Sequence, residues 1–407
     1  MISQQDKATL RELAKKYKEL AELPVQAERR NRAGDINDLK PRRPVVLINE
    51  IPWHEMDIDG KMQLTCEDDY ARIMEWRLRS TLFRWEYFQA DMVVEPFLPV
   101  MRAYNNSGIG LDVDEARLST DDNSGIVSHS YKDQLDTMEK VMALKEPIIT
   151  ADKALDAQRV NIAEDAIGDI LPIRLRGHYI YHAPWDKIPH YRGANNVLID
   201  LMDNPELMHA TIKKWTEHGL SIMKQMEAQD LLDSHIADLH CTPAFTSDLK
   251  PGNKLENTWF RCMAQLFTEI SPAMWKEFEL DYVMPLAKMC GLTYYGCCEA
   301  LERKIPMLKT IPNLRKVGVS PWANPESCAE QLAGDYVYAH KPNPAFVSAD
   351  LNRESVKAEI TRIIKTCMEN KCPYEFVLKD ISTVSYKPAN LIEWNKTVQE
   401  TIDEYYR

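Results

Sequence analysis

Short apolar segments alternate with helical stretches along most of the chain. The first, residues 44–48 (PVVLI), is a continuous apolar run of the kind that parallel sheets bury on both faces. The other strands predicted from such runs cover 92–96, 171–176, 232–241, 292–298, 314–319, 336–338 and 374–378. Strands that alternate with helices favour βαβ units and a parallel sheet. We therefore expect an α/β fold, a (β/α)8 TIM barrel of about eight such units.

Two helix starts are marked by residues that cap and open helices. Asp203 and Asn204 can each cap a helix whose first residue is Pro205. Ser271 followed by Pro272 repeats this arrangement. Helices are therefore predicted to begin at both prolines, between predicted strands.

The N-terminal segment, residues 1–40, is polar, with apolar residues at three- and four-residue spacing. It predicts a helical extension packed on the outside of the main domain. The whole chain of 407 residues exceeds the length at which one core usually stops growing, about 250–300 residues. Because no repeat or flexible linker interrupts it, residues 41–407 are predicted to form one barrel domain.

Composition excludes several classes of protein. The 50 basic and 62 acidic residues give a net charge of −12, which disfavours nucleic-acid and anionic-membrane partners. No apolar run reaches the roughly 18 residues of a membrane helix, and the first residues do not form a signal peptide. Nine cysteines without a small-scaffold spacing favour reduced thiols or a metal site over disulfides. These features predict a cytoplasmic protein.

Four motifs follow one another in the second half of the chain. The motif DNPEL opens a helix within 195–220, and SPAMWKEF lies within 271–291. The segments LTYYGCCEAL (292–301) and NLRKVGVSPWANPE (313–326) come next. This order of motifs resembles the uroporphyrinogen decarboxylase superfamily. The resemblance covers residues 40–400 and implies a (β/α)8 barrel, in agreement with the pattern of strands and helices.

The superfamily has two branches with different chemistry. Its decarboxylases are metal-free and bind the carboxylates of a tetrapyrrole through arginines after the first strand. Here residues 49–54 (NEIPWH) stand in that place and contain no arginine. The other branch comprises zinc-dependent methyltransferases that work with a corrinoid (cobalamin) protein or a thiol cofactor.

The methyltransferase branch uses His-x-Cys on one strand and a later cysteine. Cys297 matches the first cysteine, whereas Tyr295 replaces the histidine and no cysteine stands near Ser382. The resemblance is therefore nearer to this branch, but the zinc ligands of the family are incomplete.

Residues at predicted strand ends supply other metal ligands. Cys297 and Glu299 would share one strand face, and His240 and Cys241 end another strand. Thiolate, carboxylate and imidazole groups can hold Zn²⁺ with one open position, where it keeps sulfur ionised or polarises a substrate oxygen. The alternative is that the cysteines, including Cys298, only fill a buried strand.

Three residues are candidates for acid–base catalysis. Glu50 and His54 follow the first strand, and Asp238 would share a face with His240. The alternatives are a salt bridge for Glu50, and a helix cap and a surface histidine for the other pair.

A further set is predicted to bind substrate. Trp53 could form a wall for a flat substrate, and the alternating row after residue 173 could bind a carboxylate or phosphate through charge-assisted hydrogen bonds. Such rows are also common as structural ion pairs. The candidates are Trp53, Arg174, Arg176, His178, Tyr179 and, in the last strand-end loop, Lys379.

The resulting hypothesis is a methyltransferase that moves a methyl group from a small methylated substrate to a corrinoid protein or another acceptor. One alternative is a metal-free decarboxylase or lyase acting on a tetrapyrrole or another acid, using Arg174, Arg176 and Asp238. A second alternative is a non-catalytic corrinoid- or tetrapyrrole-binding protein. The sequence is compatible with a homo-oligomer, and it does not identify the substrate or the methyl acceptor.

Overall fold

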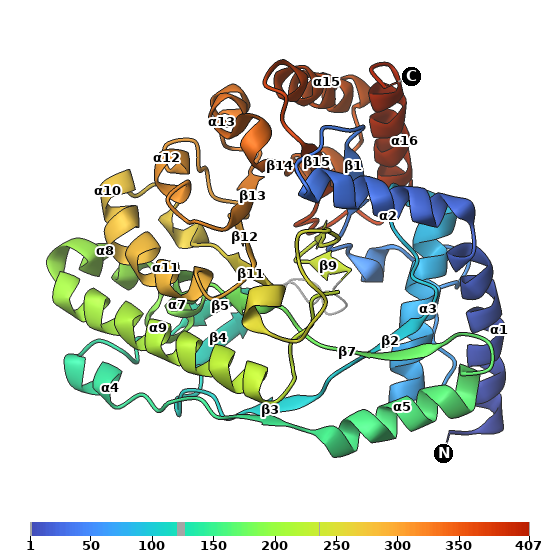
Figure 1. The fold of residues 1–407 in the computed structure, drawn as a ribbon, viewed down its shortest axis with the longest axis horizontal. Helices are drawn as coiled ribbons and strands as arrows, with labels where there is room; N and C mark the ends of the chain where they lie inside the picture. The colour runs from blue at the N-terminus through green and yellow to red at the C-terminus, as the bar shows by residue number, and fades with distance from the viewer. Residues whose placement is uncertain (1, 120–126, 236, 407) are drawn as a thin grey trace.

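A computed structural model describes residues 2–119, 127–235 and 237–406. Its centre is a parallel seven-stranded sheet with the order β1-β15-β14-β13-β12-β11-β8 (Figure 1). The strands are β1 (Val45–Ile48), β8 (Ile180–His182), β11 (Trp259–Cys262), β12 (Leu292–Tyr295), β13 (Leu314–Val319), β14 (Val337–His340) and β15 (Tyr374–Leu378). The α/β class is therefore confirmed.

The two edges of this sheet are not joined by strand pairing among the described residues. Strands β2 (Leu98–Met101) and β7 (Ile173–Arg176) form a separate parallel pair, and His178 forms a parallel bridge with Leu232. Beside β1, the amide of Asp91 donates to the carbonyl of Val46 at 2.8 Å. The arrangement is barrel-like, but a complete ring of eight paired strands is not shown.

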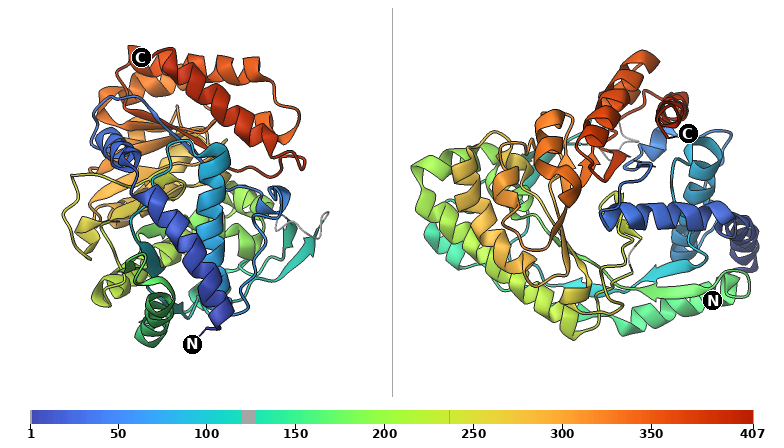
Figure 2. Two further views of the ribbon diagram at one scale, coloured as in Figure 1. Left: turned by 90° about the vertical axis from the view of Figure 1, so that its right-hand side faces the viewer. Right: turned by 45° about the horizontal axis from the view of Figure 1, so that its top comes forward.

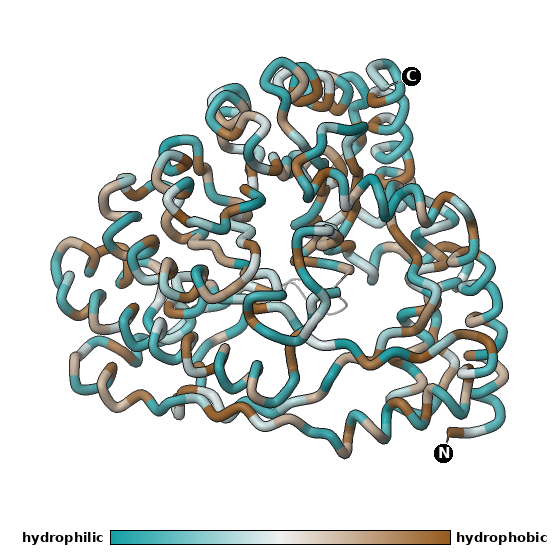
Figure 3. Tube along the Cα trace, in the orientation of Figure 1, coloured by the Kyte–Doolittle hydropathy of each residue, from teal (hydrophilic) through white to brown (hydrophobic). Residues whose placement is uncertain are grey.

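Helices surround the sheet, and their hydrophobic and hydrophilic residues alternate along the chain (Figure 3). The longer helices are α1 (Gln4–Ala21), α2 (Pro24–Asn37), α3 (Asp69–Phe88), α5 (Lys153–Ile167), α8 (Ala194–Asp203), α9 (Pro205–Ala228), α11 (Asp281–Ala287), α13 (Pro325–Leu332), α15 (Arg353–Glu369) and α16 (Ala389–Asp403). The short ones are α4 (Met138–Met142), α6 (Pro184–Lys187), α7 (Pro189–Arg192), α10 (Pro272–Trp275), α12 (Ile305–Leu308) and α14 (Ala345–Ser348). No helix in the described ranges is long and apolar enough to cross a bilayer.

Both predicted helix starts are confirmed. Helix α9 begins at Pro205 directly after Asn204, although no side chain caps it. Helix α10 begins at Pro272, and the hydroxyl of Ser271 accepts a hydrogen bond from the amide of Met274 at 3.2 Å. A π-helical segment, Lys276–Leu280, connects α10 to α11.

The N-terminal segment forms two helices, with a break before Pro24. Helix α1 lies beside α3 (Figure 2, left) and buries Leu10, Leu13 and Tyr17 in a cluster that also contains Met74 and residues of α5. The boundary at residue 40 stays a prediction.

Two strand predictions are wrong. Residues 92–95 are irregular because their backbone pairs with α2 side chains: Val94 donates to Gln26 at 2.8 Å and Met92 accepts from Arg29 at 3.2 Å. Among the described residues of 232–241, the structure has the isolated bridge at Leu232 and the two-residue strand β9 (Asp238–Leu239), which pairs antiparallel with β10 (Thr242–Pro243). Strands β8 and β11 were not predicted.

Besides β2, β7, β9 and β10, four more of the described strands lie outside the seven-stranded sheet. Strand β3 (Tyr104–Asn106) pairs antiparallel with β6 (Ile149–Ala151). Strand β4 (Glu115–Leu118) pairs antiparallel with β5 (Ser128–Tyr131). They extend the connections between the first strands of the fold.

Candidate functional site

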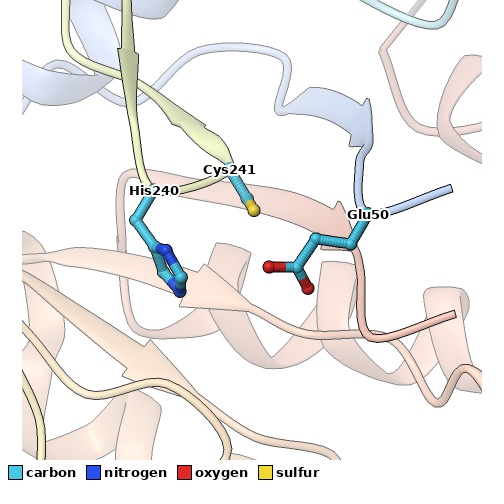
Figure 4. Close-up of side chains that lie close together, drawn as sticks. All are labelled: Glu50, His240 and Cys241. Carbon is cyan, nitrogen blue, oxygen red and sulfur yellow. The ribbon is translucent and has the colours of Figure 1, made fainter. Parts of the chain in front are cut away.

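Chemically reactive side chains meet where β1, β12 and β15 end and where the β9–β10 hairpin turns. We call this set the six-residue cluster; it comprises Glu50, His240, Cys241, Cys297, Cys298 and Asp380. Its first half is Glu50, His240 and Cys241, whose side chains point toward one another (Figure 4), and its second half is the other three. Within each half, the potential ligand atoms lie within 4.8 Å of one another.

The two halves meet at Cys297. Its Sγ lies 3.7 Å from Nε2 of His240 and 3.7 Å from Sγ of Cys298. The Cys298 thiol in turn donates a hydrogen bond to Oδ2 of Asp380 at 2.7 Å. Sulfur, imidazole and carboxylate groups from three separate chain segments therefore form one connected site.

The turn that carries His240 and Cys241 has an unusual backbone. Leu239 pairs with Thr242, and the two residues between them have φ angles of 44° and 72°. Two-residue hairpin turns of this kind normally use Asn and Gly, because other residues are strained in the left-handed region. Two contacts hold the turn: Lys316 donates to the Thr242 hydroxyl at 2.6 Å, and Asn49 donates to the Cys241 carbonyl at 2.8 Å.

The loop of Cys297 begins with Gly296, directly after β12 ends at Tyr295. Gly296 has a φ of 95°, and a Cβ there would lie 2.4 Å from Leu301. The prediction that Cys297 and Glu299 share a strand face is therefore wrong, because the strand has already ended. Both lie in the loop after the turn at Gly296.

Glu299 ties this loop to the loop after β11. Its carboxylate accepts hydrogen bonds from the amides of Cys297 at 2.8 Å and Ala264 at 3.2 Å. The side chain is buried, and this burial raises its pKa to about 7. In this structure Glu299 positions Cys297, and its role as a metal ligand stays a prediction.

A buried lysine organises the acidic side of the site. Lys379 Nζ lies 3.2 Å from Oε2 of Glu50 and 2.9 Å from Oδ1 of Asp380, and Glu50 also accepts from the Asp380 amide at 3.0 Å. Burial opposes ionisation of Glu50, but the charge of Lys379 and these hydrogen bonds outweigh it and lower the pKa of the carboxyl. Glu50 is therefore a carboxylate at neutral pH.

The two central cysteines have opposite pKa shifts. The hydrogen bond from Cys298 lowers the pKa of Cys297 against the effect of burial, with help from His240 and Arg261. The same hydrogen bond and burial raise the pKa of Cys298. Cys297 is thus the thiolate of the pair, and Cys298 keeps its single proton, which it can give to Cys297 or to Asp380 but not to both at once.

Four of the predicted acid–base and aromatic residues lie outside the six-residue cluster. Trp53 contacts the rings of Trp76 and Phe83 of α3, with centroid distances of 5.8 and 6.0 Å. These four residues are Trp53, His54, Asp238 and Tyr179. His54 Nε2 lies 3.6 Å from its neighbour Glu55, Asp238 is exposed on β9, and Tyr179 packs against the apolar group around Leu239 and Trp259.

The predicted anion-binding residues Arg174, Arg176 and His178 make contacts within the protein instead. Arg174 and Arg176 lie over the ring of Phe97, and Arg176 pairs with Asp233 at 3.2 Å. His178 lies 2.8 Å from the carbonyl of Arg102. These are the structural ion pairs and packing contacts that were the alternative to anion binding.

Sequence reasoning missed several groups near the site. The Tyr181 ring lies 5.8 Å from the His240 ring, and Asp186 accepts two hydrogen bonds from Gln265, each of 2.9 Å. Arg261 and Lys341 are buried, and Arg261 contacts Met263, which packs with Cys297 in one buried cluster. The sequence did contain a signal for Arg261 and Lys341, because each lies within or directly after an apolar strand. A charged side chain is costly to bury, so its presence there indicates a function.

Two distances in the cluster fit neighbouring ligands of a tetrahedral zinc ion. Zinc bonds of about 2.3 Å to sulfur and about 2.0–2.1 Å to nitrogen imply ligand–ligand separations of roughly 3.5–3.8 Å. Cys297 lies 3.7 Å from both His240 Nε2 and Cys298 Sγ. Cys297 could therefore share a zinc ion with His240 or with Cys298, and a carboxylate oxygen of Asp380 lies within 4.8 Å of both cysteine sulfurs.

Comparison with known proteins relates the chain to others through its fold. No protein-family model and no curated protein sequence matches it. Among solved structures, a methyltransferase from Methanosarcina mazei is similar, with a TM-score of 0.51 and 10% sequence identity. The similarity covers 93% of this chain and 99% of that one, so the two share an overall fold along nearly their whole length.

Proposed function

We propose that this chain is a zinc-dependent methyltransferase of the uroporphyrinogen decarboxylase superfamily. It would move a methyl group from a small methylated substrate to a corrinoid protein or another acceptor. The observation that carries the proposal is the set of 3.7 Å distances that join Cys297 to His240 and Cys298. The fold shared with a Methanosarcina mazei methyltransferase, and the acidic composition typical of a cytoplasmic protein, support it.

Cys297, Cys298 and His240 would hold the metal. Bound zinc would keep an acceptor sulfur ionised or polarise the heteroatom that carries the methyl group. Asp380, already hydrogen-bonded to Cys298 at 2.7 Å, is placed to receive its proton when that thiol ionises. Lys379 would balance the negative charge of the thiolates, because it is buried beside Asp380 and Glu50.

The substrate heteroatom that loses its methyl group keeps the bonding electron pair and needs a hydrogen-bond donor. The Tyr181 ring lies 5.8 Å from the His240 ring, and the residue is 43% exposed. Burial raises the pKa of its hydroxyl, which therefore stays protonated and able to donate. Glu50, as a carboxylate, would accept a proton from the methyl acceptor.

The decarboxylase alternative is less well supported. It requires cationic groups that converge on a substrate acid, and Arg174 and Arg176 are instead stacked over Phe97. The non-catalytic alternative predicts tight binding of cobalamin without turnover. A visible absorbance titration with cobalamin, followed by an assay for methyl transfer to it, separates that alternative from the enzyme.

The test of the metal site is elemental analysis of purified protein. We expect about one zinc per chain in the wild type and less than about a tenth of that in Cys297→Ser, because removing one of three ligands weakens binding strongly. Cys290→Ala, a buried cysteine outside the six-residue cluster, is the matched control and should keep its zinc. Substoichiometric zinc in the wild type, or equal zinc in Cys297→Ser, would refute the proposal.

A further inference from the structure

Beneath the six-residue cluster, three cationic side chains surround one tyrosine ring. The guanidinium carbon of Arg261 lies 4.1 Å from the centroid of the Tyr294 ring. The Nζ atoms of Lys316 and Lys341 lie 5.7 and 5.5 Å from the same centroid. All four side chains are buried, and they come from β11, β12, β13 and the residue after β14.

Only one of these cations has a carboxylate partner. Lys316 pairs with both oxygens of Glu375 at 3.0 Å. Arg261 donates to the carbonyl of Cys262 at 2.6 Å and its Nη2 lies 3.6 Å from the sulfur of Met263, but its Nε has no partner. Lys341 Nζ has no hydrogen-bond partner either, and neither residue has an ion pair within the described part of the chain.

Two buried cations without an ion pair are costly, because each charge has lost its hydration. Lys341 is 3% exposed and Arg261 is 0% exposed. Among the described residues, Arg261 Nε, Lys341 Nζ and the Tyr294 hydroxyl have no partner at hydrogen-bonding geometry, although Lys341 lies close to that hydroxyl. These three polar atoms lie around one ring, an arrangement that an oxyanion would complete.

The position of these donors relative to Cys297 connects them to the reaction. Arg261 Nη2 lies 3.6 Å from the sulfur of Met263, and Met263 packs with Cys297 and Cys298 in one buried cluster. Among the described residues, Glu375 is the carboxylate that forms an ion pair with one of the three cations, and the other two have none. An anion bound beside Cys297 would therefore lie close to positive charge that no ion pair neutralises.

We propose that Lys341, Arg261 and Tyr294 form an oxyanion subsite that holds a carboxylate, sulfonate or phosphate group of the substrate. The substrate is then a small methylated acid, with its anionic end on the floor of the site and its methyl group beside Cys297. This substrate class rests on the proposed function, whereas the subsite itself does not depend on the metal or on methyl transfer.

The test compares two alkylating reagents of similar shape and different charge. Iodoacetate is an anion and iodoacetamide is neutral; with both, the cysteine sulfur bonds to carbon and iodide leaves. Rates at Cys297 and Cys298 are measured by mass spectrometry after dialysis against a chelator, and N-acetylcysteine provides the reference ratio. A change in thiolate content affects both reagents equally, so the ratio of rates reports only attraction of the anion.

We expect the ratio of the iodoacetate rate to the iodoacetamide rate to exceed that of N-acetylcysteine by about 10-fold. Lys341→Met should remove most of this preference, and Lys341→Arg should keep it. Lys365→Met, which removes an exposed charge on α15, is the control and should leave it unchanged. In the wild type alone, added acetate should slow alkylation by iodoacetamide, whereas acetamide should not.

Three outcomes would overturn the inference: a ratio equal to that of N-acetylcysteine, a ratio that Lys341→Met leaves unchanged, or no alkylation of either cysteine, which would mean that small molecules cannot reach the site. A clear preference for the anion in a protein without zinc would refute the proposed function and keep the subsite. Zinc binding without a preference for iodoacetate would refute the subsite and keep the proposed function.

Discussion

Replacing Lys316 by methionine should destabilise the protein strongly. Its ammonium group pairs with Glu375 at 3.0 Å and donates to the Thr242 hydroxyl at 2.6 Å, and both charged side chains are buried. Burial lowers the pKa of Lys316 to about 8, even beside a carboxylate. The variant leaves Glu375 buried without a counter-ion, which typically costs about 3–5 kcal/mol.

A double substitution isolates the pair from its surroundings. In Lys316→Met with Glu375→Leu, no charge is left unpaired, so we expect a loss of only about 1 kcal/mol. Urea unfolding followed by far-UV circular dichroism at neutral pH measures both free energies. Lys365→Met, at an exposed position on α15, is the control and should stay within about 0.5 kcal/mol of wild type. The reasoning is refuted if the single variant loses less than about 1 kcal/mol, or if the double variant is as unstable as the single one.

Two further predictions concern the loop after β15 and acid stability. Glu55 accepts hydrogen bonds from the Thr383 hydroxyl and the Val384 amide, each of 2.6 Å, so Glu55→Gln should speed limited proteolysis within 381–388 and cost about 1–3 kcal/mol in urea unfolding. Unchanged cleavage there would contradict this role. Burial lowers the pKa of His182 to about 4, so the unfolded chain protonates first and stability falls as the pH drops from about 6.5 to 4. His182→Phe should lessen that fall in urea titrations, and a parallel pH dependence in both proteins would refute it.

The sequence predicted those strands whose apolar runs are continuous. Strands β13 and β15 have the predicted bounds, and β1, β7, β12 and β14 overlap their predictions. Strand β11 was missed because Arg261 interrupts its apolar run, and that residue is accommodated by the ring of Tyr294 on the neighbouring strand and by the carbonyl of Cys262. The 92–96 prediction failed because the segment's backbone pairs with side chains of α2, which no local pattern reveals.

The sequence predicted most of the residues of the site but not how they are arranged. Glu50, His240, Cys241 and Cys297 were all candidates, and the structure brings them together. Their grouping depends on turns with left-handed backbone angles, which the alternation of side chains along a strand cannot anticipate. For the same reason, Asp380 beside Lys379 was not weighed as a partner of a cysteine.

Four residues of the six-residue cluster have a left-handed backbone conformation. Glu50, His240, Cys241 and Asp380 have φ angles of 50°, 44°, 72° and 57°. Non-glycine residues in this region cost on the order of 1 kcal/mol or more each, so the surrounding contacts must compensate for several kcal/mol. Those contacts are the buried donors already described: Lys316 on Thr242, Asn49 on Cys241 and Lys379 between the two carboxylates.

Because these contacts lie within the protein, the fold itself holds the reactive side chains in place. If only a bound ligand arranged these side chains, they would point apart in its absence. Here Cys297 lies 3.7 Å from both His240 and Cys298. Preorganisation of this kind lowers the cost of binding a metal or substrate, since little ordering is left to be done. The strain at these turns is therefore best explained as the cost of bringing imidazole, thiol and carboxylate groups close enough together to bind one ligand.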